Sequence, residues 1–288
     1  MHGAPLAEST GQRPLLLVCD LDRTLIPNGP QPEDPDALGR LRDLACAPGV
    51  HLAFATGRDA ARVRRAMSEW NLPAPGYVIA DVGATVYRVD GDDWHADAAW
   101  TETLSQEWRD ENGLDLLTYI GDLPGARPQE ANRMSRFKCS YYVDIDHEED
   151  AQLAARHRLI SLGLSSRLIW SVDVERDTGL LDILPASASK LGGLRVVQRN
   201  LGVSDDDTVF AGDSGNDLEV LTSGVPSILV GNAEPQVVAR ARRLARQKRT
   251  LRSLYIASEH GDGANYAAGV LAGLTHHRPD RPVPRGTS

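Results

Sequence analysis

The chain has 288 residues, of which 41% are hydrophobic and 25% charged, as is ordinary for a globular protein that buries a sizeable core. A formal net charge of −9 and an aromatic content of 5% argue against nucleic-acid binding, which relies on basic surface and stacking side chains. No apolar stretch approaches the roughly 20 residues of a membrane helix, the start has no signal-peptide pattern, and the three cysteines lack metal-ligand spacing. We therefore expect a cytoplasmic protein that binds neither nucleic acid nor membranes.

Short apolar runs alternate with helical periodicity along most of the chain, which predicts an α/β fold with a parallel sheet. The polar, Pro/Gly-rich ends, residues 1–13 and 276–288, are expected to be disordered tails. Between them we expect a Rossmann-like core domain formed by residues 14–88 and 182–275. Residues 89–181 are expected to form a smaller α+β cap domain, because an insertion between two halves of one core is typical of a lid over a crevice.

The first expected strand, residues 15–19, runs directly into Asp20 and Asp22. Two carboxylates two residues apart at a strand end project the same way, at the edge of the sheet where ligands bind in open α/β folds. One can attack phosphorus while the other transfers a proton. The alternative interpretation is that the two acids end a strand and cap a turn.

The second expected strand, residues 51–55, is followed by Thr56 and Gly57. A hydroxyl and a backbone amide at this position can both donate hydrogen bonds to a phosphoryl oxygen, and glycine permits close approach of the backbone. The alternative is that Thr56 only caps the next helix. A third strand at residues 77–80 and a hairpin at 82–87 are expected to follow.

The inserted region has a different order of elements. Its pattern predicts helices near residues 97–112 and 148–162 and strands at residues 137–144 and 167–172. The core is then expected to resume with a strand at residues 181–184.

Lys190 lies at the expected start of the next helix. An amine there can neutralise charge on a nucleophile and on a phosphoryl group, although a lone lysine at a helix start is more often exposed to solvent.

The segment from Gly212 to Asp217 follows another buried strand, at residues 208–211. Its two carboxylates, Asp213 and Asp217, are four residues apart across a helix start and so share one face. Two such carboxylates repel unless a cation lies beside them, and oxygen donors near a phosphate site are suited to Mg²⁺. A capping role for Asp213 is the alternative, and it leaves the rest of the segment unexplained.

The four motifs in this order resemble the haloacid dehalogenase (HAD) superfamily of phosphohydrolases. The resemblance implies that Asp20 is the nucleophile, that Asp22 is the general acid/base, that Thr56 holds the phosphoryl group and that Lys190 steadies the nucleophile. It implies Mg²⁺ as cofactor, held by Asp20, by the backbone carbonyl of Asp22 and by Asp213. We count Asp217 with this metal set, and we expect it and Asn216 to support the site.

The insertion resembles the type IIB cap, and segments such as Phe54–Arg58, Phe137–Tyr142 and Leu181–Pro185 resemble the sucrose-phosphate phosphatase family. The family commonly has Ser where Ala84 stands, and residues 171–179 and 260–265 look longer than in the family. The resemblance implies an enzyme whose cap grips a sugar, with a substrate-binding set completed by these residues: Gly57, Arg58, Gln129, Glu130, Lys138 and Asn216. We expect a monomer.

Sucrose 6-phosphate is the substrate that the resemblance favours. The alternative substrates are mannosylfructose phosphate and glucosyl- or mannosylglycerate phosphates. A phosphomutase is a weaker alternative activity. The protein is also a candidate to associate with a sucrose-phosphate synthase, as an enzyme or as a non-catalytic partner.

Overall fold

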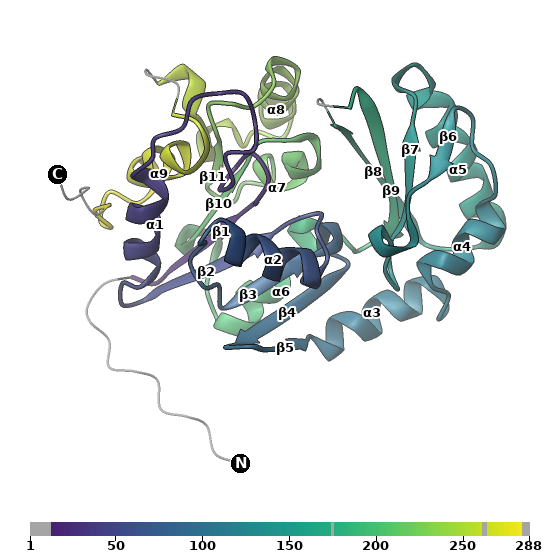
Figure 1. Cartoon of the computed structure of the whole chain (residues 1–288), viewed down its shortest axis with the longest axis horizontal. Helices are drawn as coiled ribbons and strands as arrows, with labels where there is room; N and C mark the ends of the chain where they lie inside the picture. The colour runs from purple at the N-terminus through teal and green to yellow at the C-terminus, as the bar shows by residue number, and fades with distance from the viewer. Residues whose placement is uncertain (1–12, 174–175, 261–263, 284–288) are drawn as a thin grey trace, which may run out of the picture.

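The computed structural model describes residues 13–173, 176–260 and 264–283, which form two sheets with helices packed against them (Figure 1). The larger sheet has eight strands in the order β12-β11-β10-β1-β2-β3-β4-β5, parallel from β12 to β3 and antiparallel at β4 and β5. Its strands are β1 (Leu15–Cys19), β2 (Val50–Ala55), β3 (Tyr77–Ala80), β4 (Thr85–Asp90), β5 (Asp93–Ala96), β10 (Thr208–Gly212), β11 (Ser227–Leu229) and β12 (Leu254–Ile256). The predicted α/β class is confirmed.

Both faces of the larger sheet are covered by helices, which explains why its central strands are continuous apolar runs. On β1, Leu15 and Leu17 pack into one hydrophobic cluster, whereas Leu16 and Val18 pack into the other. The first cluster contains α1 (Ala37–Ala45), α2 (Ala60–Glu69) and α9 (Tyr266–His277), and the second contains α6 (Lys190–Leu201), α7 (Leu218–Leu221) and α8 (Pro235–Gln247).

The smaller sheet is antiparallel, in the order β6-β7-β9-β8, and forms the cap. Its elements are β6 (Ala126–Pro128), β7 (Cys139–Val143), β8 (Ser166–Asp173), β9 (Thr178–Pro185), α3 (Ala98–Trp108), α4 (Gly113–Ile120) and α5 (Glu148–Leu162). Alternate side chains of β7, including Cys139 and Tyr141, pack with α4 and α5 on the side away from the core (Figure 1). The intervening side chains of β7 are polar and lie on the side toward the core.

Short 3₁₀ turns complete the chain, and three of them, η1, η5 and η7, border the carboxyl ends of the parallel strands. The turns are η1 (Asp81–Gly83), η2 (Ala131–Arg133), η3 (Ile145–His147), η4 (Asp205–Asp207), η5 (Gly215–Asp217), η6 (Leu251–Ser253) and η7 (Ala257–Glu259). None of the helices in the described ranges is long and apolar enough to cross a membrane.

The sheets divide the chain differently from the predicted domain boundaries. The strand predicted at residues 181–184 does not belong to the core, because β9 pairs with β7 and β8 in the cap sheet. Conversely, residues 93–96 form β5 of the core sheet rather than part of the insertion. A buried strand has a similar apolar pattern in either sheet, so the pattern alone does not show whether the strand belongs to the core or to the cap. The helix predicted at 97–112 is also shorter, because Arg109 adopts a left-handed backbone (φ 51°) and ends α3.

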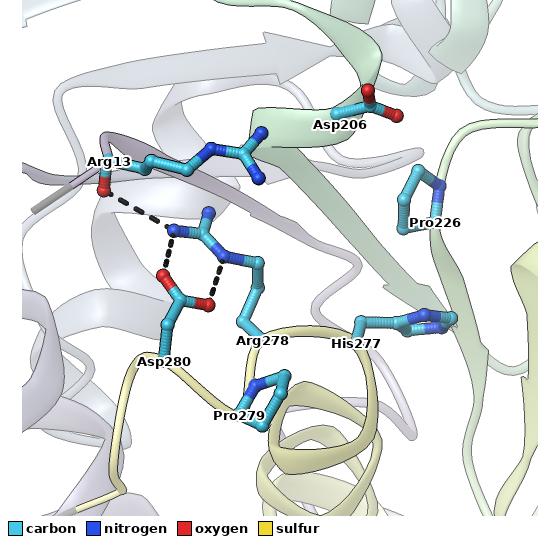
Figure 2. A pocket seen from close by; sticks show the side chains of 7 residues that line it. All are labelled: Arg13, Asp206, Pro226, His277, Arg278, Pro279 and Asp280. Atoms are coloured by element: carbon cyan, nitrogen blue, oxygen red, sulfur yellow. Dashed lines mark hydrogen bonds and ion pairs between the residues drawn. The ribbon is translucent and has the colours of Figure 1, made fainter.

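The prediction of a disordered C-terminal tail from residue 276 is wrong for residues 276–283. Arg278 is 3% exposed, pairs with Asp280 at 2.7 Å and donates to the backbone oxygens of Pro14 and Arg13 at 2.9 and 3.3 Å (Figure 2). Arg281 is equally buried and donates to the backbone oxygen of Pro48 at 2.8 Å. These bonds hold the chain after α9 against the start of β1. Most of the other predicted tail, residues 1–12, and residues 284–288 lie outside the described residues.

Candidate active site

The residues at the carboxyl ends of three adjacent parallel strands meet at one edge of the core sheet. Strand β1 lies between β2 and β10, so Asp20, Thr56 and Asp213, each directly after its strand, lie side by side. Lys190 reaches the same point from the first residue of α6, whose preceding residue Ser189 caps the helix through a hydrogen bond to the amide of Gly192. The structure thus brings the four predicted motifs together.

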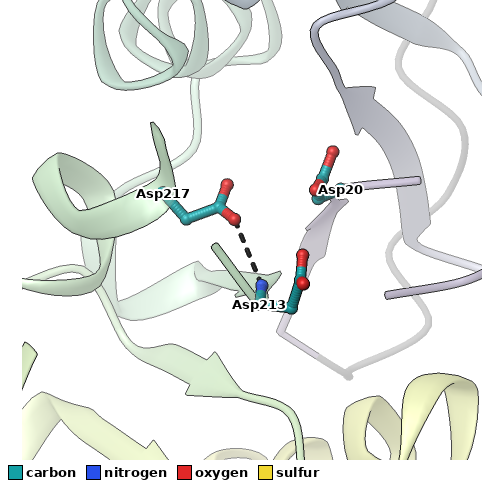
Figure 3. A group of neighbouring side chains, drawn as sticks. All are labelled: Asp20, Asp213 and Asp217. Atoms are coloured by element: carbon teal, nitrogen blue, oxygen red, sulfur yellow. Dashed lines mark hydrogen bonds between the residues drawn. The ribbon is translucent and has the colours of Figure 1, made fainter. Parts of the chain in front are cut away.

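Three buried carboxylates form the centre of this edge. Oxygens of Asp20, Asp213 and Asp217 all lie within 4.8 Å of one another (Figure 3). The ammonium of Lys190, which is 1% exposed, lies 3.0 Å from Asp20 Oδ1 and 2.7 Å from Asp217 Oδ1. One buried cation therefore bridges the predicted nucleophile and the last carboxylate of the Gly212–Asp217 segment.

The electrostatics of the cluster favour an additional positive charge. Burial, opposed by Lys190 and reinforced by Asp217, raises the pKa of Asp20 to about 7. Burial and the neighbouring Asp20 and Asp217 carboxylates hold the pKa of Asp213 well above its usual range. Burial alone would lower the pKa of Lys190, but the attraction of Asp20 and Asp217 outweighs it and raises that pKa. The carboxylates repel more than the single ammonium offsets, and a divalent cation bound by their oxygens would remove the imbalance.

The donor set fits a hard divalent cation, because clustered carboxylate oxygens are its preferred protein ligands. The oxygens are not equally available. Asp217 uses Oδ1 for Lys190 and Oδ2 for the backbone amides of Asp213 and Ser214, at 3.1 and 3.0 Å. A Cβ at Gly212 would come within 2.5 Å of the Asp217 carboxyl carbon, so the glycine makes room for this arrangement. The geometry gives Asp217 a supporting role. Asp20 Oδ2 and the oxygens of Asp213, whose contacts with Thr24 and Arg23 are long at 3.4 Å, are the ones most available to a cation.

The loop after β2 is built to approach a ligand closely. Thr56 is fully buried, and its hydroxyl accepts the amide of Arg58 at 3.2 Å. A Cβ added to Gly57 would meet no protein atom closer than Val82 Cγ2 at 3.7 Å among the described residues. Packing therefore does not require glycine at position 57, whereas close approach of a phosphoryl group would.

The second acid of the first motif has two strong partners that the sequence did not reveal. Arg58 Nε and Nη2 donate to Asp22 Oδ2 and Oδ1 at 2.8 and 2.5 Å, and Asn28 Nδ2 donates to Oδ1 at 2.8 Å. Burial would raise the pKa of Asp22, but the hydrogen bonds and charge of Arg58 outweigh it and lower that pKa. Arg58, predicted only to bind substrate, thus orients Asp22 in this conformation.

A second basic residue beside the cluster, Arg23, was also missed. Its Nε lies 3.4 Å from Asp213 Oδ2, and its Nη2 lies 2.9 Å from Glu234 Oε1. Asn232 donates to the backbone oxygen of Arg23 at 2.7 Å, which fixes a residue whose φ is 57°. Its position next to Asp22 was the available signal, but the direction of its side chain depends on partners 190 to 211 residues away in the sequence.

The predicted cap residues lie in two places. Lys138 is 4% exposed and donates to the backbone oxygen of Gly57 at 3.1 Å, so it contacts the loop after β2 of the core directly. Gln129 is half-buried and donates to the backbone oxygen of Tyr141 at 3.3 Å, and Glu130 is exposed and accepts the hydroxyl of Tyr142 at 2.9 Å. Within the described residues, Lys138 bonds to the core, whereas the hydrogen bonds of Gln129 and Glu130 stay within the cap.

Two further polar residues on the core-facing side of the cap sheet were not predicted. Ser140, two residues after Lys138 on β7, is fully buried, and its hydroxyl donates to Asp182 Oδ1 at 2.5 Å on the neighbouring strand β9. Both residues lie within predicted strands, where every second side chain faces the same side of the sheet. A polar residue at such a position is ordinary and gave no signal of a site.

The cap also touches the Gly212–Asp217 segment. A Cβ at Gly215 would lie 3.1 Å from the backbone oxygen of Trp170 on β8, and Arg167 on the same strand pairs with Glu219 of α7. Asn216 is half-buried beside this contact and accepts the Ser214 hydroxyl at 3.1 Å. Much of the long segment 171–179 continues β8 and begins β9, with Asp173 opposite Thr178. Residues 174–175, and residues 261–263 of the second long segment, lie outside the described part of the chain.

Comparison with known proteins matches residues 13–278 to the model of the family described as sucrose-6F-phosphate phosphohydrolase. A Nitrosococcus oceani protein whose name goes no further than HAD-like hydrolase is 42% identical over 270 residues, 92% of this chain and 72% of that protein. The mannosylfructose-phosphate phosphatase of Agrobacterium fabrum is 29% identical over 91% of this chain and 96% of its own. Two other matched relatives are much longer, and the chain spans 28% and 52% of them.

Among solved structures, the sucrose-phosphatase of Synechocystis sp. PCC6803, in complex with sucrose and phosphate, superposes with a TM-score of 0.74. It is 25% identical, and the match covers 92% of this chain and 98% of that one.

Proposed function

Because the chain belongs to the sucrose-6F-phosphate phosphohydrolase family and is a phosphoric monoester hydrolase of HAD subclass IIB, we propose that it removes phosphate from a disaccharide phosphate, sucrose 6-phosphate first. The observation that carries the proposal is the buried Asp20, held by Lys190 at the edge of the sheet and facing a cap whose core-facing side is polar. Mg²⁺ is the proposed cofactor.

The first half of the proposed reaction transfers the phosphoryl group to the protein. Asp20 attacks phosphorus in line with the sugar oxygen, forming an aspartyl phosphate as the P–O bond to the sugar breaks. Thr56 and the amide of Gly57 donate hydrogen bonds to the phosphoryl oxygens, and Lys190 offsets their charge. Asp22 first leaves Arg58, whose ion pair favours the ionised carboxylate, and takes up a proton from solvent, which it then gives to the departing sugar oxygen.

The second half regenerates the free enzyme. Asp22, now ionised, takes a proton from water, which attacks phosphorus and displaces the Asp20 carboxylate. The Arg58 guanidinium stabilises this ionised form, in keeping with the lowered pKa of Asp22. Lys190 again balances the charge of the released Asp20.

The proposed Mg²⁺ site consists of Asp20, Asp213 and the backbone carbonyl of Asp22, with Asp217 and Asn216 behind them. When bound, the ion would offset the negative charge of the nucleophile and of the phosphoryl oxygens. Asp217 orders the segment that carries Asp213 and keeps Lys190 charged beside Asp20.

A disaccharide is proposed because the cap supplies polar groups on the side toward the core. Ser140 and Asp182 lie on adjoining strands, and Lys138 directly precedes β7. Gln129 is half-buried and Glu130 is exposed after β6. The structural similarity to a sucrose-phosphatase supports sucrose 6-phosphate, and the 29% identical relative supports mannosylfructose phosphate as the second candidate.

A substrate panel tests the proposal, and it is expected to rank disaccharide phosphates above monosaccharide phosphates in kcat/KM. The panel contains sucrose 6-phosphate, mannosylfructose phosphate, glucosylglycerate phosphate and glucose 6-phosphate, each assayed for phosphate release with Mg²⁺ and with excess chelator. We expect sucrose 6-phosphate to exceed glucose 6-phosphate by at least about tenfold, since lost polar contacts with a second sugar each cost roughly a kcal/mol or more. Chelation should abolish release, and refilling with Mg²⁺ should restore it.

Equal kcat/KM for mono- and disaccharide phosphates would contradict the proposed role of the cap. Release that persists in the chelator would contradict the proposed cofactor.

A further inference from the structure

The η1 turn at residues 81–83 has an unusual backbone. Asp81, Val82 and Gly83 all have positive φ, at 53°, 59° and 101°. Left-handed backbone costs roughly 1–2 kcal/mol for residues with a Cβ, so two such residues in a row persist only where surrounding contacts hold them. A Cβ at Gly83 would lie 2.0 Å from the backbone oxygen of Ser189, so the turn is pressed against the start of α6.

This turn and the cap together bind three consecutive carbonyls of the phosphate loop. The amide of Val82 donates to the oxygen of Thr56 at 2.9 Å, and the amide of Asp81 donates to the oxygen of Arg58 at 3.0 Å. The oxygen between them, on Gly57, accepts Lys138 Nζ from the cap at 3.1 Å. With its carbonyls fixed on one side, the loop presents the Gly57 amide on the other.

The side chain of Asp81 holds this cap lysine. Asp81 Oδ1 lies 3.5 Å from Lys138 Nζ, and both side chains are only 5% exposed. Oδ1 is buried with no hydrogen-bond partner in the described part of the chain, so the ammonium is its main compensation there. A buried ammonium without a counter-ion is costly, and the described residues place Asp81 nearest to it.

The environment of the pair is fixed by neighbouring groups. Thr85 donates to Asp81 Oδ2 at 3.5 Å, while Asp59 and Arg62 of the core act on the carboxylate from further away with opposite signs. Burial raises the pKa of Asp81, and Lys138 opposes that effect.

We propose that Asp81 is a positioning residue whose carboxylate keeps Lys138 of the cap against the Gly57 carbonyl, so that the cap and the η1 turn jointly hold the Thr56–Arg58 loop in its phosphate-binding shape. The inference rests on the proposed function, in which that loop binds the phosphoryl group. It gives Lys138 a task toward the core in addition to any contact with sugar. Asp81 itself does not touch the substrate.

Asp81→Asn is the test, because the amide keeps the shape of the side chain and removes its charge. We expect kcat to fall about tenfold or more with both sucrose 6-phosphate and 4-nitrophenyl phosphate, since small misplacement of a binding group is enough for such a loss. The aryl ester has no sugar, so its hydrolysis reports on the phosphate loop alone. Asp205→Asn, which removes the partner of Arg195 at the core surface, is the matched control and should stay within about twofold of wild type.

A double-mutant cycle separates positioning from general destabilisation. Asp81→Asn leaves a buried ammonium unpaired and should lower the unfolding midpoint, whereas Asp81→Asn combined with Lys138→Met removes both charges and should recover much of it. With the aryl ester, kcat should stay low in the double variant. Because Asp81 acts through Lys138, the double variant should have a kcat within about twofold of that of Lys138→Met alone. A purely structural role predicts that activity recovers together with the midpoint.

Hydrogen exchange of residues 54–60 supplies a readout that needs no substrate. We expect faster exchange there in Asp81→Asn and Lys138→Met than in wild type and Asp205→Asn. If wild type hydrolyses only the aryl ester, the proposed sugar substrate is wrong, and kcat with the aryl ester still tests the role of Asp81. If wild type hydrolyses neither substrate, hydrogen exchange of residues 54–60 tests that role. Unchanged exchange, or kcat within twofold of wild type, would overturn the role of Asp81.

Discussion

Asp20→Asn is expected to lower kcat for sucrose 6-phosphate by at least about 10³-fold, because removing a covalent nucleophile leaves only binding and electrostatic catalysis. The amide has nearly the shape of the carboxylate but does not attack phosphorus. Phosphate release measured over a range of enzyme concentrations, with Mg²⁺ present, gives the loss directly.

The fold should survive this substitution. Asp20 is one of several buried carboxylates, and Lys190 keeps its 2.7 Å contact with Asp217 when Asp20 is neutral. Since burial disfavours the ionised form of Asp20, we expect the unfolding midpoint without metal to be unchanged or higher. Asp205→Asn serves again as the matched carboxylate control. Near-normal release by a folded Asp20→Asn protein would rule out Asp20 as the nucleophile.

Lys190→Met is expected to destabilise the protein and to inactivate it. The ammonium is 1% exposed and contacts both Asp20 and Asp217, so its removal leaves buried carboxylates uncompensated. Breaking a buried pair in this way typically costs about 3–5 kcal/mol, and we expect a loss of that order in the free energy of unfolding measured in urea with chelator. With Mg²⁺, kcat should fall at least about 10²-fold because a charge-stabilising group is lost.

Two further variants make this result specific. Lys248→Met removes an exposed lysine at the end of α8 whose ammonium donates to Thr222 Oγ1 at 3.0 Å. It should change the unfolding free energy by no more than about 1 kcal/mol, well below the loss expected for Lys190→Met. Adding Asp217→Asn to Lys190→Met should restore part of the lost stability by removing one uncompensated carboxylate. Equal stability of Lys190→Met and wild type would contradict the buried ion pairs.

The centre of the site was predictable because it depends on local rules. Asp20, Thr56 and Asp213 each follow a short apolar strand, and parallel strands bring such positions to one edge. Lys190 was predictable only jointly with them, since one lysine at a helix start carries little information. The order of these four residues, rather than any one of them, identified the family.

The features that the sequence did not predict depend on contacts between distant parts of the chain, which no local pattern encodes. The strand at residues 178–185 is apolar whether it joins the core or the cap, and its pairing with β7 and β8 decides its domain. Arg58 was expected to meet substrate, but Asp22 comes within 2.5 Å of it when β1 and β2 align. The anchored residues Arg278 and Arg281 looked like a polar tail because their partners lie near residues 13–48.

Contacts across the boundary between cap and core were the least predictable. Lys138 was chosen as a sugar ligand because a lysine is unusual in an apolar strand, and its buried bond to Gly57 is explained only by the docked cap. Asp81, in a turn between two strands, had no sequence signal at all. Its backbone contacts the loop after β2, and its side chain contacts Lys138, which directly precedes β7.

The most direct test of an aspartyl-phosphate phosphatase is to trap the intermediate on its residue. The protein and its Asp22→Asn variant would be mixed with 4-nitrophenyl phosphate and Mg²⁺, quenched in acid and digested for mass spectrometry. This leaving group needs no proton from Asp22, so the variant should slow hydrolysis of the intermediate more than its formation. The predicted result is one phosphoryl group on the peptide that carries Asp20, at higher occupancy in the variant and absent from Asp20→Asn. Phosphate release without any phosphorylated Asp20 peptide, or with the phosphoryl group on another residue, would contradict the mechanism.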